Sequence, residues 1–200
     1  MNEDPLIIAF YLAIALYLGH VYRLDIQAFS KGVPNAKALP GAVPIPALLT
    51  VASVLLGIVL LGNAVIGEYA LGLVDAQSEM VWFFIFASLS AGVIEEIVFR
   101  GYLVFENRGR NALLLSCLAF SLLFALIHGY LWSFEDGFSW VFTVQSIYNT
   151  WILFINSLVF YGIRFGPWNP QRSMLPSIIA HMVFNLGVFL VKWMQGFIIF

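Results

Sequence analysis

The chain has 200 residues, of which 62% are hydrophobic and only 10% are charged. A water-soluble domain carries about 25% charged residues, so this sequence is expected to lie in lipid rather than in water. The net charge of −2 and the lack of a basic patch exclude a nucleic-acid-binding protein, and the single cysteine, Cys117, excludes a disulfide within the chain.

Six hydrophobic stretches are long enough to cross a bilayer as helices, since a spanning helix needs about 20 mostly apolar residues. In chain order they are residues 6–22, 45–66, 80–105, 112–132, 138–163 and 174–193. Four prolines make residues 32–46 a loop. The sequence therefore predicts an all-α, polytopic membrane helical bundle with about six transmembrane helices. Within one membrane domain, two N-terminal helices in residues 1–79 would precede a core in residues 80–200.

The charges of the connections alternate along the chain. Eight of the nine Lys and Arg residues fall in or beside the first, third and fifth connections, and the second and fourth connections contain no Lys or Arg. The acidic residues of those two connections are Glu68, Asp75, Glu79, Glu135 and Asp136. Under the positive-inside rule the base-rich connections are cytoplasmic. We therefore expect a multi-pass protein of the cell membrane with an extracytoplasmic N-terminus.

Three ionisable residues, Glu95, Glu96 and Arg100, interrupt the third hydrophobic stretch. Each charge at mid-bilayer costs about 2.5–3.5 kcal/mol, so these groups must pair, neutralise or face a wet cavity. Glu96 and Arg100 are four residues apart and share a helix face in the favourable order, which predicts an ion pair. Glu95 points about 100° away and has no such local partner, so its carboxylate is a candidate base toward water.

Two other hydrophobic stretches contain residues of catalytic type. His128 lies in the fourth, whereas His181 and Asn185 lie four residues apart in the sixth and share a face. Helix counting places His128 in the outer half of its span, so convergence with Glu95 requires that helix to begin deep or to tilt. Each residue alone could serve only helix packing. Their combination favours a catalytic site in the interior of the bundle.

The same residues form three motifs that resemble those of a known family. Residues 95–100 match E-E-x-x-x-R, residues 124–128 match F-x-x-x-H and residues 181–185 match H-x-x-x-N, in the family's order. The chain is thereby identified as a member of the CAAX-protease and bacteriocin-processing (CPBP or Abi) family. The resemblance covers roughly residues 80–192, and the first two predicted spans carry no mark of the family.

The resemblance implies an intramembrane glutamic endopeptidase of CAAX type, whose substrate is a membrane-associated or lipidated peptide. Glu95 would activate the attacking water, and His128 would assist that step. His181 and Asn185 would stabilise the oxyanion. Membrane lipid and a peptide or protein substrate are therefore the expected partners.

Within this resemblance Glu96 and Arg100 would support the site, and Glu96 could help directly. Glutamate and two histidines could also hold zinc. We favour a mechanism without metal or cofactor, because the asparagine is a poor zinc ligand and a good oxyanion donor.

Two other functions remain as alternatives. A non-catalytic membrane protein of the same family, such as a bacteriocin-immunity or scaffold protein, could use the motif residues for binding. A proton carrier could use Glu95 and the histidines as a relay. Transporters usually contain repeated halves, which this sequence does not show.

Overall fold

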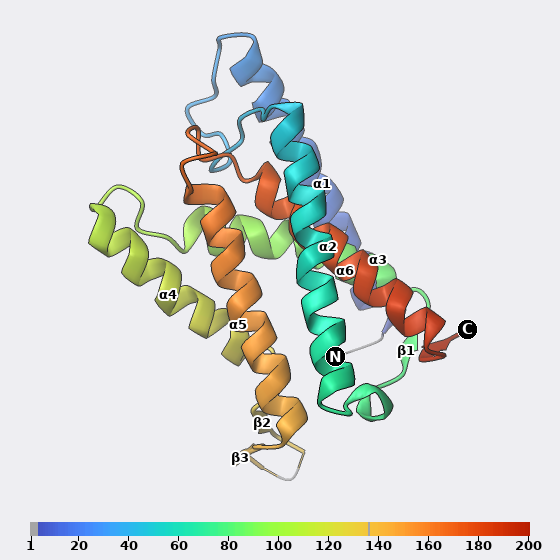
Figure 1. The fold of residues 1–200 in the computed structure, drawn as a ribbon. Helices are drawn as coiled ribbons and strands as arrows, with labels where there is room; N and C mark the ends of the chain where they lie inside the picture. Colours follow the sequence, from blue (N-terminus) through green and yellow to red (C-terminus); the bar gives the residue numbers. More distant parts are fainter. Residues whose placement is uncertain (1–3, 136) are drawn as a thin grey trace.

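The computed structural model describes residues 4–135 and 137–200, so Asp136 of the predicted acidic connection lies outside the described residues. Within this part the chain forms six α-helices (Figure 1). They are α1 (Pro5–Ser30), α2 (Ala47–Ala70), α3 (Phe84–Glu95), α4 (Arg110–Ile127), α5 (Val144–Phe165) and α6 (Leu175–Met194). A short 3-10 helix, η1 (Val74–Ala76), follows α2, and a π-helix, η2 (Glu96–Tyr102), follows α3.

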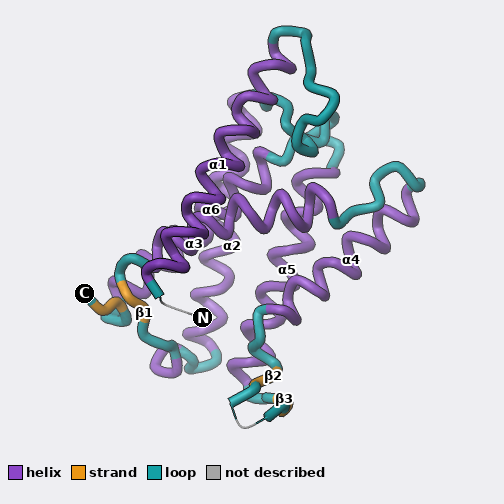
Figure 2. Tube along the Cα trace, turned by 180° about the vertical axis from the view of Figure 1, so that it is seen from behind, coloured by secondary structure: helices purple, strands orange, loops and turns teal. Residues whose placement is uncertain are grey.

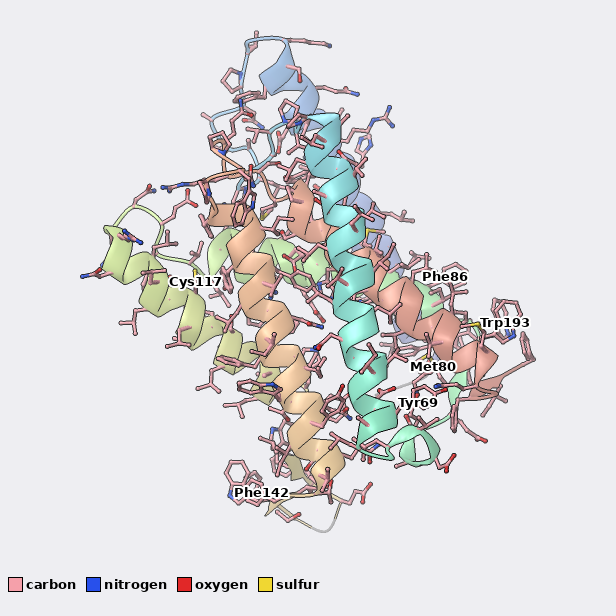
Figure 3. The ribbon with its side chains drawn as sticks, in the orientation of Figure 1. Tyr69, Met80, Phe86, Cys117, Phe142 and Trp193 are labelled. Carbon is pink, nitrogen blue, oxygen red and sulfur yellow. The ribbon has the colours of Figure 1, made fainter. Side chains whose placement is uncertain are left out.

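The outer surface of the bundle is apolar, as a lipid-embedded protein requires. In the described part of the chain, five helices are long and apolar enough to cross a membrane, namely all except α3. Large hydrophobic side chains cover their outer faces. Figure 3 shows Trp193 of α6 and Phe142, just before α5, at the periphery, where each is more than half exposed. The predicted all-α, polytopic membrane fold is confirmed.

The third predicted span differs from a single 26-residue helix. It begins with strand β1 (Met80–Val81), continues as the 12-residue α3 and ends in the seven-residue π-helix η2. An i→i−5 hydrogen bond from Leu103 N to Val98 O, at 2.9 Å, closes the last wide turn. Figure 2 shows this segment changing direction and running toward α4. The charged motif therefore lies where regular α-helix ends, which hydropathy alone could not locate.

Two pairs of short strands lie at the same end of the bundle (Figure 1). β1 pairs in parallel with β4 (Ile198–Ile199), and β2 (Trp132–Ser133) pairs with β3 (Ser139–Trp140) as an antiparallel hairpin between α4 and α5. The first pair connects the start of α3 to the segment that follows α6. The ends of these two helices are therefore held together.

The helices pack in a pattern that places α3 and α6 next to each other in the interior. α1 lies along α3, α2 lies along α6, and α4 lies along α5 (Figure 1). α2 approaches α6 closely at Gly57, where an added Cβ would lie 2.6 Å from the carbonyl oxygen of Ala180. The two N-terminal helices are therefore packed directly against the helices that carry the motifs.

The base-rich connections lie together at one end of the bundle. The backbone nitrogen of Met174 donates to Gly41 O at 3.1 Å, which joins the first and fifth connections, and Glu106 of the third connection pairs with Arg164 at 3.2 Å. At the other end, Gln145 Nε2 donates to Ala76 O at 2.7 Å. This grouping agrees with the charge alternation, whereas the side that faces the cytoplasm stays a prediction.

Replacement of Gly57 by alanine should destabilise the protein. The methyl group would meet the backbone of α6, and such overpacking costs about 1–3 kcal/mol, more than the helix propensity gained. Thermal unfolding in detergent should show a lower midpoint for Gly57→Ala. Gly62→Ala in the same helix is the matched control, because nothing lies within 4 Å of its added Cβ. An unchanged midpoint for Gly57→Ala would contradict the observed packing of α2 on α6.

Cysteine labelling can test the predicted orientation. With Cys117→Ser as background, Lys37→Cys and Asp75→Cys place single thiols in exposed connections at opposite ends of the bundle. We expect a membrane-impermeant maleimide to label position 75 in intact cells and to reach position 37 only after the cells are opened. The reverse pattern would place the base-rich end outside.

Candidate active site

The predicted ion pair between Glu96 and Arg100 lies in the centre of the bundle. Arg100 Nη1 is 3.2 Å from Glu96 Oε1, and both side chains are fully buried. The two residues occupy η2, where the positions i and i+4 remain near one face of the helix. Because neither charge reaches solvent, each depends on the other for stabilisation.

Arg100 is surrounded by groups from α4 and α5. Its Nη2 donates a 2.6 Å hydrogen bond to Ser157 Oγ, and Ser157 donates in turn to Ser121 Oγ at 3.0 Å. The guanidinium also lies 4.8 Å from the ring centroid of Phe124 and 5.0 Å from that of Tyr161. These cation–π contacts stabilise the charge without water. Arg100 therefore fixes the position of η2 against two other helices.

His181 of α6 contacts both glutamates. Its Nδ1 lies 2.9 Å from Glu96 Oε1, and its Nε2 lies 3.9 Å from Glu95 Oε2. The imidazole also stacks on the ring of Phe160, with centroids 4.9 Å apart and planes inclined by 21°. Since Glu96 is paired with Arg100 as a carboxylate, the hydrogen of the shorter contact belongs to Nδ1. The orientation of the ring is thus determined by Glu96 on one side and Phe160 on its face.

Glu95 differs from Glu96 in its surroundings. It is the last residue of α3, its side chain is 22% exposed, and its carboxylate has a looser contact with His181. Glu96 is fully buried and binds both Arg100 and His181. Glu95 is therefore the more accessible of the two carboxylates.

Asn185 lies one turn beyond His181 on α6 and faces α3. Its Nδ2 donates a 2.8 Å hydrogen bond to the carbonyl oxygen of Ser88. This bond uses one of the two amide hydrogens. The second hydrogen remains available to a ligand.

His128 lies at the C-cap of α4 and adjoins Phe124, whose ring also contacts Arg100. Its Nδ1 donates to the carbonyl oxygen of Phe124 at 2.6 Å, and its ring is 4.6 Å from the Phe124 ring. The Phe124 ring also contacts His181, with centroids 6.3 Å apart. His128 thus adjoins the cluster through Phe124 and has no direct bond to Glu95 or His181 among the described contacts. α4 is inclined across the bundle toward α5 (Figure 1), which agrees with the tilt that the depth of His128 required.

Sequence reasoning missed several residues of this site. Ser157, Ser121 and Phe160 surround the charged pair, and Asn156, the neighbour of Ser157 in the chain, is also buried. The only sequence signal was the presence of polar residues in otherwise apolar helices. No spacing rule connects α5 to Arg100, which lies 57 residues earlier in the chain.

The donor arrangement does not fit a zinc centre. Among the described residues, no group of three or more His, Cys, Asp or Glu side chains is placed to hold a metal ion. Glu96 is occupied by Arg100 and His181 Nδ1, and a guanidinium 3.2 Å from Glu96 would repel a cation there. Within residues 4–135 and 137–200 the side chains therefore offer no zinc-ligand set.

Residues 77–187 match the model of a protein family described as "Rce1-like: Type II CAAX prenyl endopeptidase Rce1-like". The match covers more than half of the chain and contains all three motifs. No curated protein and no solved structure matches the chain.

Removal of the Arg100 cation should destabilise the bundle strongly. Arg100→Leu leaves the buried carboxylate of Glu96 without its main partner, which costs about 3–5 kcal/mol for pairs of this kind. Thermal unfolding in detergent should show the loss, and Glu96→Gln combined with Arg100→Leu should recover part of it. Arg108→Leu is the control, because Arg108 is exposed. Equal unfolding midpoints for Arg100→Leu and the wild type would contradict the inferred role of the pair.

Proposed function

The chain belongs to the Rce1-like family of type II CAAX prenyl endopeptidases, and we propose that it is an intramembrane endopeptidase that hydrolyses a membrane-associated or lipidated peptide. The proposal rests above all on His181, which contacts adjacent glutamates through its two nitrogens. One glutamate is buried and already paired, whereas the other is partly exposed. This asymmetry supports separate roles for the two carboxylates.

Glu95 is the proposed general base. Its carboxylate would take a proton from water as the water oxygen bonds to the substrate carbonyl carbon, and it would return that proton to the amine when the C–N bond breaks. Glu96 cannot take this role readily, because the adjacent Arg100 cation favours its ionised form and occupies it. Glu96 instead orients His181.

His181 and Asn185 are the proposed oxyanion donors. Because Nδ1 of His181 donates to Glu96, a hydrogen on Nε2 exists only in the imidazolium form. In that form Nε2 could donate its hydrogen to the oxyanion while Nδ1 keeps its bond to Glu96. The free amide hydrogen of Asn185 would supply a second donor from the same face of α6.

His128 would assist the water. Its Nδ1 hydrogen is committed to the carbonyl oxygen of Phe124, so Nε2 carries a lone pair in the neutral ring. A lone pair can accept a hydrogen bond from water and hold it for attack. The contact of Phe124 with both histidines would set their separation.

A non-catalytic membrane protein of the same family would require different properties of these residues. A scaffold or immunity protein would need the Glu96–Arg100 pair for folding but would not need the proton-accepting ability of Glu95. Glu95 makes only the 3.9 Å contact to His181, which a glutamine could retain. Substitution at Glu95 therefore separates the two functions without disturbing the fold.

Glu95→Gln should abolish cleavage while leaving insertion and thermal stability unchanged. Loss of general-base catalysis lowers rates by about 10²–10⁴-fold. Purified protein in lipid nanodiscs would be incubated with an internally quenched peptide that ends in a farnesylated CAAX sequence, and mass spectrometry would identify the products. Glu79→Gln, at an exposed position, is the control. Cleavage by Glu95→Gln at the wild-type rate would refute the proposed role of Glu95.

A further inference from the structure

Asn156 on α5 is a buried polar side chain without a partner. Its side chain is 3% exposed, and neither its Nδ2 nor its Oδ1 atom has a hydrogen-bond partner within the described part of the chain. An unpaired amide is costly in an apolar interior, and more so within a bilayer, where water does not compensate it. The mechanism proposed above gives this residue no role.

The packing of α5 shows which way Asn156 faces. Val159 and Phe160, at the positions i+3 and i+4, pack in one cluster with Leu60 of α2 and Ala180 of α6. Residues at these spacings share a helix face. Asn156 therefore points toward α2 and α6, and neither toward lipid nor toward the Ser121 side of α5.

The position of Asn156 along the bundle places it beside the candidate active site. Phe160, one turn further along α5, stacks on His181. α5 and α6 run in opposite directions on either side of a short connection (Figure 1), so a turn back along α5 corresponds to a turn forward along α6. Asn185 lies one turn after His181 along α6. Asn156 thus lies on the Asn185 side of the His181–Phe160 stack.

We propose that the side-chain amide of Asn156 is a positioning group that binds a backbone peptide group of the substrate. An amide offers a donor and an acceptor side by side, which matches the N–H and C=O of a peptide unit. A peptide that enters the bundle in an extended form brings such groups without partners, and every one must be satisfied within the membrane. This inference rests on the proposed function, which it deepens by naming a contact for the substrate backbone.

Peptide binding tests the inference without requiring hydrolysis. In the Glu95→Gln background, Asn156→Leu should weaken the binding of a fluorescent farnesylated CAAX peptide in nanodiscs by about tenfold, as expected for a lost buried hydrogen bond. Asn156→Gln, which keeps the amide, should recover part of the affinity. Asn63→Leu, at an exposed position of α2, is the matched control and should bind as the parent does.

Two further measurements separate this role from a structural one. The thermal unfolding midpoint of Asn156→Leu should equal or exceed that of the parent, because the substitution removes an unpaired buried group. With Glu95 intact, Asn156→Leu should raise KM and leave kcat nearly unchanged. A lower unfolding midpoint, unchanged affinity, or a fall in kcat without a change in KM would each overturn the inference.

Failure of the proposed function would give a different result. If the wild-type protein binds the peptide but does not cleave it, the proposed hydrolysis fails, and the affinity comparison at position 156 still decides the inference. If the Glu95→Gln parent binds no peptide, the inference is overturned together with the proposed substrate class.

Discussion

The ion pair between Glu96 and Arg100 is the interaction on which the interior of this protein depends. Arg100 contacts Ser157 of α5 and the ring of Phe124 of α4, while Glu96 contacts His181 of α6. Every helix that carries a motif therefore meets at these two charges. A charge in the bilayer that loses its partner is strongly destabilising, so this pair constrains the positions of α3, α4, α5 and α6 together.

Five of the six spans, and the ion pair between Glu96 and Arg100, could be predicted from the sequence because each depends on a local pattern of residues. Hydropathy over about 20 residues indicates a spanning helix whatever its neighbours are. The spacing of Glu96 and Arg100 places them on one face in any helical geometry close to α. The grouping of the base-rich connections likewise follows from the alternation of charge, and the bonds from Met174 to Gly41 and from Arg164 to Glu106 agree with it.

The rest of the site depends on tertiary packing, which single-sequence patterns do not contain. The change from α-helix to π-helix at Glu96 arises where Arg100 meets α4 and α5, and hydropathy predicted one continuous span instead. Ser157 and Asn156 are separated from the motifs along the chain and belong to no spacing rule. The motifs indicated that His181, Glu95 and Glu96 belong to one site. That His181 contacts both glutamates follows only from the packing of α6 against α3.

The bond between Glu96 and His181 spans 85 residues, and this has a consequence for biosynthesis. At about 5–20 residues per second, roughly 4–17 s separate the synthesis of the two side chains. During that interval α3 and η2 are in the translocon or the bilayer without α6. Arg100 is then the only partner near enough in the chain to neutralise Glu96, so the four-residue spacing protects the nascent segment.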